Sequence, residues 1–253
     1  MRAMILAAGL GTRLQPLTDD RPKALVEIAG RTLLEITLFR LRDFGISEVI
    51  INVHHFADKV RDYLQAKRNF GMRIEISREE VLLDTGGGLK KAAWFFLENS
   101  DREEPFLVHN VDVLSTIDLE NMVRFHHRNQ ALATLAVQDR ETSRYLLFDD
   151  RHMLCGRRAG REGEAELVRP VRAAEARAFT GIHVISPRIF ARITQHGVFS
   201  IIDSYLNLSQ GGERIVAFGA DGYYWRDLGR PEHVAQAVRD LEREILRPPG
   251  QKG

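Results

Sequence analysis

Apolar residues come in short blocks along the first half of the chain, separated by stretches with helical periodicity. Residues 3–8 form a fully apolar run, which predicts a strand buried at the centre of a parallel sheet. Leucines recur at helical spacing across 34–41, with Gly45 as the expected C-terminal cap of that helix. A second apolar run at 48–53 predicts the next strand. The chain therefore begins with a predicted strand–helix–strand unit.

The same alternation continues to about residue 130. Thr85 and Asp118 stand where the N-caps of two helices are expected, because their side chains can accept hydrogen bonds from the N–H groups of a first turn. This rhythm predicts an α/β fold of the Rossmann-like, doubly wound type with a mostly parallel sheet. The further elements expected here are a helix through Val60 and Leu64, a strand at 72–77, a loop opening a helix at 84–99, a strand at 105–113, and a helix bearing Leu119, Met122 and Val123.

The pattern changes after residue 130, where short strands joined by tight turns are expected. Residues 157–177 are polar and basic with few apolar anchors, which predicts a loop or a mobile flap. Ser200 and Asp203 have the spacing of a capping box and predict the start of a helix. No internal repeat or linker interrupts the chain, so we expect one domain. The remaining expected elements are strands at 131–138, 144–150, 151–156, 178–186, 214–219 and 223–229, a last helix using Val234, Val238, Leu241 and Ile245, and a tail at 249–253.

Charge and cysteine content narrow the classes of function. The chain has 36 Lys and Arg against 35 Asp and Glu, so no overall field favours nucleic acid. The single cysteine, Cys155, excludes an internal disulfide and a cysteine metal cage, and it suits a reducing cytoplasm. No stretch approaches the roughly 18 apolar residues of a membrane span, and the apolar start fits a first strand better than a signal peptide. We therefore expect neither nucleic acid nor a membrane as a partner.

The candidate chemistry is concentrated in a glycine-rich turn after the first predicted strand, LAAGLGTR (6–13). Ligands bind at the carboxyl edge of parallel sheets, and small residues let backbone N–H groups approach phosphate oxygens. The turn lacks the lysine of a P-loop, and Leu14 stands where a dinucleotide fingerprint needs its third glycine. Instead, Arg13 follows at once and Lys23 comes ten residues later. Two cations beside a backbone nest predict a triphosphate site.

The longer run LAAGLGTRLQPLTDDRPK (6–23) resembles the signature of the sugar-1-phosphate nucleotidyltransferases, or NDP-sugar pyrophosphorylases. Further similarity lies in an aspartate after the fourth strand and in TGGG (85–88), TGIHVIS (180–186) and YWRDLGRPE (224–232). Within the family, the chain is most similar to short members such as N-acetylmuramate-1-phosphate uridylyltransferases and mannose- or heptose-1-phosphate guanylyltransferases. No hexapeptide repeat follows residue 230, so the C-terminal β-helix of larger relatives is not expected. The resemblance implies the nucleotide-diphospho-sugar transferase fold.

This resemblance implies transfer of a nucleotidyl group from an NTP to a sugar-1-phosphate, giving an NDP-sugar for cell-wall or polysaccharide synthesis and pyrophosphate. The acceptor phosphate is already an anion, so catalysis needs no general base and consists mainly of positioning and charge neutralisation. Arg13 would hold the β- and γ-phosphates, and Lys23 would lie against the α-phosphate and the incoming phosphate. Asp112 and Asp227 match the family's two Mg²⁺ ligands, although either aspartate alone could be a helix cap.

Position in the family pattern also assigns the substrate contacts. Residues 1–130 would bind the nucleotide and 131–248 the sugar phosphate, within one domain over 1–248. The resemblance favours UTP slightly over GTP, and Glu79 or Glu80 could touch the base. The implied nucleotide contacts are Leu6, Ala8, Gly9, Gly11, Thr12, Glu79, Gly86 and Gly87, and the implied sugar-phosphate contacts are Asn110, Arg169 and Gly181.

Two departures from the family pattern keep other functions open. Val111 precedes Asp112 where the family has glycine, so its side chain must point away from the site or the backbone must differ. VRP (168–170) replaces the family's Glu-Lys-Pro, with Arg169 as a substitute phosphate fork. One alternative is a cytidylyltransferase acting on a non-sugar phosphate such as phosphocholine. Another is a catalytically silent, NDP-sugar-binding regulatory subunit. The second half would also supply the contact of a homodimer.

Overall fold

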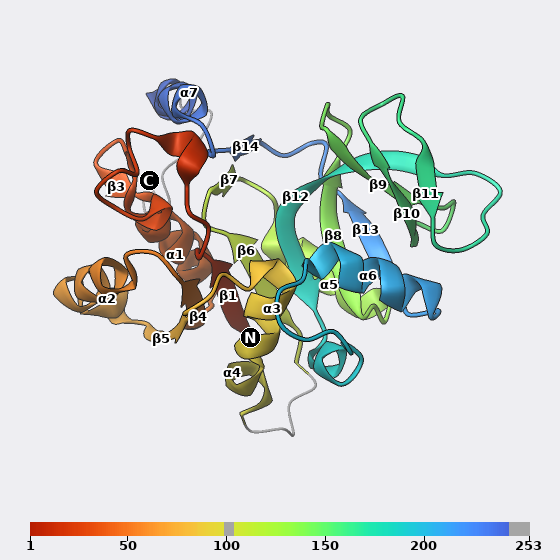
Figure 1. The fold of residues 1–253 in the computed structure, drawn as a ribbon, viewed down its shortest axis with the longest axis horizontal. Coiled ribbons are helices and arrows are strands. Elements are labelled where there is room, and N and C mark those ends of the chain that lie inside the picture. Colours follow the sequence, from red (N-terminus) through yellow and green to blue (C-terminus); the bar gives the residue numbers. More distant parts are fainter. Residues whose placement is uncertain (99–103, 243–253) are drawn as a thin grey trace.

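A mixed sheet of ten strands runs through the part of the chain that the computed structural model describes, residues 1–98 and 104–242 (Figure 1). Its strand order is β11-β10-β9-β12-β6-β1-β4-β5, with β8 paired to β12 and β13 paired to β8. The strands of this sheet are β1 (Arg2–Leu6), β4 (Glu48–Val53), β5 (Arg73–Arg78), β6 (Phe106–Asn110), β8 (Ala133–Gln138), β9 (Arg144–Phe148), β10 (Leu154–Ala159), β11 (Ala165–Leu167), β12 (Glu175–Ile185) and β13 (Ile215–Gly219).

Seven α-helices surround this sheet in the described residues: α1 (Leu33–Asp43), α2 (Ala57–Ala66), α3 (Asp84–Lys91), α4 (Ala93–Leu97), α5 (Leu119–Arg128), α6 (Ile201–Gln210) and α7 (Pro231–Glu242). Four short 3₁₀ helices connect elements: η1 (Thr12–Leu14), η2 (Lys23–Leu25), η3 (Arg68–Gly71) and η4 (Pro187–Ala191). Two small two-stranded sheets complete the fold, β2 (Glu27–Ile28) with β3 (Arg31–Thr32) and β7 (Val113–Ser115) with β14 (Trp225–Asp227).

The predicted parallel sheet is present in the amino-terminal half of the molecule. β4 and β6 both pair with β1 in parallel, and β5 extends this set. β12 then joins β6 in the antiparallel direction and also pairs with β8 and β9. The β12–β8 register shifts between Phe179 and His183, which marks an irregularity in the strand. The α/β fold class is therefore confirmed, with antiparallel pairs added by the second half.

Side-chain alternation along β1 explains the layering. Ala3 and Ile5 face a core formed with α1, α2, α5 and α7, whereas Met4 faces a second core formed with α3, α4 and α6. All three side chains are fully buried, so the strand needs apolar residues at every position. The continuous apolar run in the sequence is thus the consequence of a sheet covered on both faces.

Several predicted helix boundaries are confirmed by their caps. The Asp118 side chain accepts a hydrogen bond from the Asn121 N–H at 2.8 Å, and Ser200 accepts one from the Ile202 N–H at 3.2 Å. Gly45 follows α1 with a φ of +75°, the left-handed conformation of a helix C-terminus. The expected cap at Thr85 is wrong. α3 begins one residue earlier, and the Thr85 hydroxyl accepts a hydrogen bond from Ile201 N–H at 3.0 Å.

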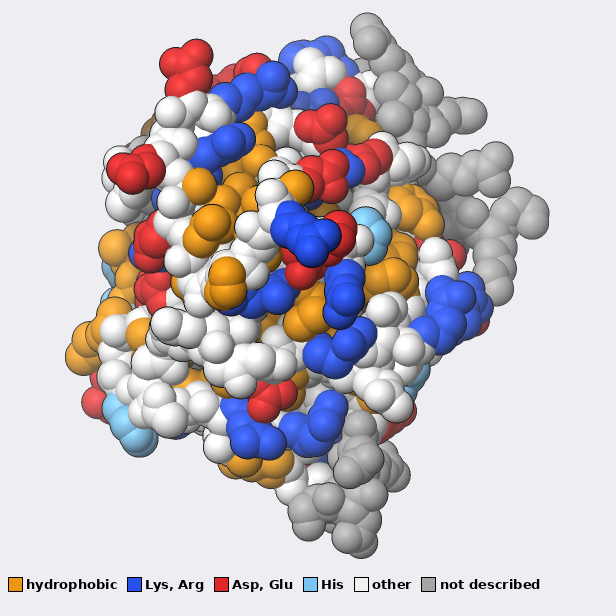
Figure 2. Space-filling model, turned by 90° about the vertical axis from the view of Figure 1, so that its right-hand side faces the viewer, with side chains coloured by type: hydrophobic (Ala, Val, Ile, Leu, Met, Phe, Trp, Pro, Cys, Tyr) orange, Lys and Arg blue, Asp and Glu red, His pale blue; other side chains and the backbone are white. Residues whose placement is uncertain are grey.

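The loop expected at 157–177 is wrong in part: residues 160–164 and 168–174 lie outside strands, but β10 continues to Ala159, β11 lies inside this stretch and β12 begins at Glu175. β11 is an exposed edge strand without apolar alternation, so its pattern gave no strand signal. Ion pairs hold this region instead: Arg157 pairs with Glu166 and Asp203. Asp203 therefore serves an ion pair, although its spacing from Ser200 suggested a capping box. Figure 2 shows this face, where basic and acidic side chains lie next to one another.

Other predicted elements are interrupted or shorter than expected. The strand predicted at 105–113 stops at Asn110, and a turn separates it from β7. The helix predicted at 84–99 divides at Ala92 into α3 and α4, and the strand predicted at 223–229 is reduced to the three residues of β14. Ile245, the side chain of Leu241, the tail at 249–253 and the predicted domain end at residue 248 lie outside the described residues or side chains.

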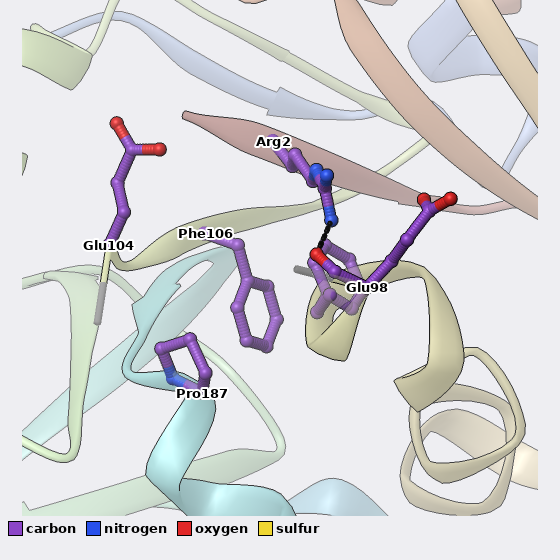
Figure 3. A pocket seen from close by; sticks show the side chains of 6 residues that line it. Arg2, Glu98, Glu104, Phe106 and Pro187 are labelled. Atoms are coloured by element: carbon purple, nitrogen blue, oxygen red, sulfur yellow. Dashed lines mark hydrogen bonds between the residues drawn. The ribbon is translucent and has the colours of Figure 1, made fainter. Parts of the chain in front are cut away.

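The two edges of the central strands differ in what they offer a ligand. In Figure 1 the opening loop (red) lies at the same end as β7, β14 and α7, while α4 lies at the opposite end. At that opposite end, Arg2 donates to the Glu98 carbonyl at 3.1 Å beside Phe106 and Pro187 (Figure 3). The cavity there measures about 20 Å³, room for about one water molecule. No helix among the described residues is both long and apolar enough to cross a membrane.

Buried histidines give the fold a predicted acid sensitivity. Burial lowers the pKa of His126 to about 4, and its Nδ1 lies 2.9 Å from the Thr134 hydroxyl. The unfolded chain therefore binds a proton between about pH 6.5 and 4 that the folded chain excludes, and stability falls as pH is lowered through this window. We expect His126→Gln, which cannot titrate, to make this fall shallower by up to about 1.4 kcal/mol per pH unit.

Urea unfolding between pH 7 and pH 4.5 measures this difference. His109 and His183, whose pKa values burial lowers to about 4 and about 3, remain in the variant, so part of the slope persists. Equal slopes for the wild type and His126→Gln contradict the assignment of a buried neutral imidazole at residue 126.

Candidate active site

The opening loop leaves the carboxyl end of β1 and folds back on itself. The Ala7 N–H donates to the Asn52 side-chain oxygen at 2.8 Å, which fixes the point of departure from the strand. The Thr18 hydroxyl then donates to the Gly11 carbonyl at 2.9 Å and closes the loop. Gly11 has a φ of +69°, and a Cβ there would lie 3.0 Å from the Thr18 methyl carbon. Glycine is therefore required at this turn.

The closed loop contains main-chain N–H groups that have no hydrogen-bond partner among the described residues. The main-chain N–H groups from Gly9 to Arg13 donate to no atom of the residues that the structure describes. Gly9 is exposed, and a Cβ built on it would meet no atom within 4 Å. The protein's own packing therefore does not require glycine at this position. Successive free N–H groups on a turn form a concave donor set suited to phosphate oxygens.

A buried network supports the loop from behind. The Asn52 amide donates to the Glu79 carboxylate at 2.7 Å, and the other Glu79 oxygen accepts from the Leu83 N–H at 2.9 Å. Glu79 is only 1% exposed, so its carboxylate serves this network. Sequence reasoning missed Asn52, whose signal is a lone amide inside the apolar run EVIINV. The network joins the ends of β1, β4 and β5 at the loop.

Lys23, Asp112 and Asp227 meet at this edge, as the sequence predicted. The Lys23 ammonium forms an ion pair with the Asp112 carboxylate. The Asp112 carbonyl accepts a hydrogen bond from the Leu228 N–H at 2.7 Å, which links the two aspartate-bearing turns. The Asp227 carboxylate accepts from the Gly229 N–H at 3.0 Å and is 35% exposed. Three charged groups from separate parts of the sequence thus share one location.

Arg13 reaches the same place from the opening loop. A Cβ on Gly229 would lie 2.8 Å from an Asp227 carboxylate oxygen and 3.2 Å from an Arg13 guanidinium nitrogen. Glycine at residue 229 therefore lets the Arg13 side chain approach the Asp227 turn. Its signal in the sequence was the DLG triplet, which sequence reasoning used only for the aspartate.

Val111 and Gly181 explain how the backbone accommodates the site. The Val111 side chain is buried in the core and its N–H donates to the Leu6 carbonyl at 3.1 Å. It therefore points away from the site, as its place before Asp112 demands. Gly181 has a φ of +80°, and a Cβ there would lie 2.6 Å from the Asn110 amide nitrogen. The predicted pair Asn110 and Gly181 is in close contact.

Asp112 and Asp227 fit a magnesium ion by the chemistry of their donors. Both offer hard carboxylate oxygens, and Mg²⁺ is commonly held by one or two carboxylates together with substrate phosphates. No cluster of three His, Cys, Asp or Glu side chains suited to a metal occurs among residues 1–98 and 104–242. The site therefore suits an ion that takes its remaining ligands from a nucleotide and from water.

Other predicted contacts have different partners in the structure. Arg169 forms an ion pair with Asp149 at 2.5 Å and donates to the Leu154 carbonyl at 2.9 Å, so its guanidinium is committed to the β9–β10 turn. The N–H groups of Gly86 and Gly87 donate to the Phe199 carbonyl at 3.0 and 3.2 Å. Their glycines allow α3 to pack closely against the segment before α6.

A cavity of about 490 Å³ adjoins the opening loop, within the size range of small-molecule pockets. Leu10 and Thr12 line it from the turn itself, and His55 lines it from the segment before α2. Its remaining lining residues, also from the opening loop, are Gln15, Thr18 and Asp19. The exposed turn therefore borders open space large enough for part of a nucleotide.

Comparison with known proteins shows the family of this chain. Residues 2–244 match the sequence model of a family described as "Nucleotidyl transferase". The N-acetylmuramate alpha-1-phosphate uridylyltransferase of Caulobacter vibrioides is 34% identical over 91% of this chain and 92% of its own length. The mannose-1-phosphate guanyltransferase beta-B of Xenopus laevis is 30% identical over 92% of this chain, which spans only 62% of that longer protein.

The fold also matches solved structures. A putative glucose-1-phosphate thymidylyltransferase from Bacillus anthracis superposes with a TM-score of 0.76, at 18% identity, covering 98% of this chain and 97% of that one. This likeness supports the fold alone, whereas the sequence matches extend through the opening loop and the Asp227 turn. The resemblance seen in the opening motif is thereby confirmed, and the chain belongs to the nucleotidyl transferase family.

Proposed function

We propose that this protein transfers a nucleotidyl group from a nucleoside triphosphate to a sugar-1-phosphate, releasing an NDP-sugar and pyrophosphate. The observation that carries the proposal is the meeting of unpaired loop N–H groups with Arg13, Lys23 and two carboxylates at one sheet edge. The names of the two curated relatives support both a uridylyl and a guanylyl transfer. UTP is the preferred donor in the proposal, because the relative of matching length is named a uridylyltransferase.

The reaction forms a bond between an acceptor phosphate oxygen and the α-phosphorus, and it breaks the bond from that phosphorus to pyrophosphate. The attacking oxygen is already ionised, so the protein's task is to bring anions together and neutralise them. The free N–H groups of the loop and Arg13 bind the β- and γ-phosphates and stabilise the leaving group. Lys23 faces the α-phosphate and the acceptor.

Lys23 has two sets of anionic partners in this scheme. Without substrate, its ammonium pairs with Asp112, which holds it at the end of β6. With substrate, the phosphates compete for the same ammonium. Mg²⁺ held by Asp112 and Asp227 would supply further positive charge to the transferring group. Asp112 thus positions Lys23 as well as serving as a proposed metal ligand.

The remaining contacts follow the division of the chain. Residues 1–130 bind the nucleotide and 131–248 the acceptor, with Asn110 and Gly181 beside the sugar ring. The proposed nucleotide contacts are Leu6, Ala8, Gly9, Gly11, Thr12, Gly86 and Gly87, with Glu79 supporting the loop from behind. Cys155 is a buried free thiol, which suits the reducing cytoplasm proposed as the location. A homodimer stays a prediction.

We expect magnesium-dependent pyrophosphate release with one pairing from a panel of four NTPs and several sugar-1-phosphates. Lys23→Ala should lower the turnover number by about 10³-fold, because it removes a cation placed against the transferring phosphate. A coupled pyrophosphate assay across the panel measures both effects and names the two substrates.

Asp112→Ala, which removes a proposed metal ligand, is the control for contaminating activity. Turnover only with CTP and phosphocholine would reject the sugar-1-phosphate acceptor and support a non-sugar acceptor. No turnover across the panel, together with saturable NDP-sugar binding, rejects the enzyme and leaves a regulatory subunit.

Gly9→Ala tests whether the open space at the loop belongs to the triphosphate. We expect the KM for the NTP to rise about 10- to 100-fold, because a methyl group would displace a phosphate from charge-assisted backbone hydrogen bonds. The melting temperature should not change, since a Cβ at Gly9 meets no protein atom within 4 Å. Steady-state kinetics and thermal denaturation measure the two quantities.

Gly219→Ala is the matched control, because a Cβ there also meets no atom within 4 Å and lies at the end of β13. It should change neither quantity. An unchanged KM in Gly9→Ala rejects phosphate binding at this part of the loop.

A further inference from the structure

Arg140 lies in the loop after β8 with its guanidinium over an aromatic ring. Its central carbon stands 3.7 Å from the centroid of the Trp225 ring, which is close contact for a cation and an aromatic face. The guanidinium also donates to the Phe179 carbonyl at 2.8 Å and, over a longer distance of 3.5 Å, to the Glu141 carbonyl. The side chain is half-buried, so these contacts hold its plane in one orientation.

No carboxylate lies within ion-pair distance of Arg140 among the residues that the structure describes. Its Nε–H is buried and has no hydrogen-bond partner. Burial lowers the pKa of the guanidinium, and the charge of Asp227 acts in the opposite direction. Two other arginines of this half of the chain are paired with carboxylates: Arg169 with Asp149, and Arg177 with Glu175 and Asp221. Arg140 is therefore a partly desolvated cation with an unused donor.

Trp225 connects Arg140 to both parts of the proposed site. Trp225 and Asp227 are alternate residues of β14 and lie on the same face of that strand. The Trp225 indole N–H donates to the Thr180 carbonyl at 2.8 Å, beside Gly181. Arg140 thus contacts a ring whose strand carries Asp227 and whose indole N–H binds the residue before Gly181.

We propose that Arg140, held on the Trp225 ring, binds the phosphate of the sugar-1-phosphate acceptor. This assignment rests on the proposed function and gives Arg140 the role that sequence reasoning gave Arg169. A planar guanidinium can donate two parallel hydrogen bonds to a phosphate, and the ring fixes the plane in which they form. The Arg169 guanidinium already donates hydrogen bonds to the Asp149 carboxylate and to two main-chain carbonyls.

Arg140→Gln should raise the KM for the sugar-1-phosphate about 10- to 100-fold, the effect of losing a hydrogen-bonded charge. The KM for the NTP should stay within about twofold of the wild-type value, since Arg140 does not touch the opening loop. Arg140→Lys keeps the charge but loses the planar fork, so we expect it to restore little of the acceptor affinity. Initial rates with each substrate varied separately measure both constants.

Arg177→Gln is the matched control, because it removes an arginine from β12 that already has two carboxylate partners. Its acceptor KM should equal that of the wild type. Two results overturn the proposal: an unchanged acceptor KM in Arg140→Gln, or a raised acceptor KM in Arg169→Gln alone.

A binding measurement separates this proposal from the proposed function. Trp225 fluorescence should change when glucose-1-phosphate or inorganic phosphate is added, and Trp94→Phe removes the signal of the other tryptophan. If the wild type has no transferase activity but Arg140→Gln abolishes this response, the reaction is wrong and the phosphate site stands. If the wild type turns over and gives no response that depends on Arg140, the phosphate site is wrong.

Discussion

The hydrogen bond from the Ala7 N–H to the Asn52 side chain sets the position of everything that follows β1. Asn52 is buried at the end of β4, and its amide is itself fixed by Glu79 at the end of β5. A buried amide and a buried carboxylate are costly unless their partners are correctly placed, so the strand ends are held in one arrangement. The glycine-rich loop can then expose its backbone without losing its shape.

This arrangement separates the support of the site from its reactive groups. The buried network holds the loop from below, whereas Arg13 and Asp227 face the exposed side. The Lys23 ammonium pairs with Asp112, and only 14% of the Lys23 side chain is exposed. The proposed roles of these groups depend on a rigid frame, because a small displacement weakens every electrostatic contact.

The sequence was sufficient for the central strands and for the charged residues of the cluster. β1 and β4 are buried on both faces, so their apolar runs are unambiguous. The opening motif contains Arg13 and Lys23, and two separate matches to the family pattern supplied Asp112 and Asp227. The sequence was insufficient where contacts with distant parts of the chain determine the secondary structure or the partner of a side chain. β11 is an exposed edge strand that only pairing with β10 defines, and the hydroxyl of Thr85 caps nothing in its own helix because Ile201 approaches it. Arg169 looked free until the fold placed Asp149 against it.

The register shift in β12 also has a chemical result. A regular strand uses its carbonyls within the sheet, but between Phe179 and His183 the pairing with β8 is broken. The Phe179 and Thr180 carbonyls turn instead to the Arg140 guanidinium and the Trp225 indole. One local irregularity in the strand pairing thus frees two main-chain carbonyls to hold the side chains of Arg140 and Trp225. A regular register in this strand would keep the sheet but remove the carbonyl partners of Arg140 and Trp225.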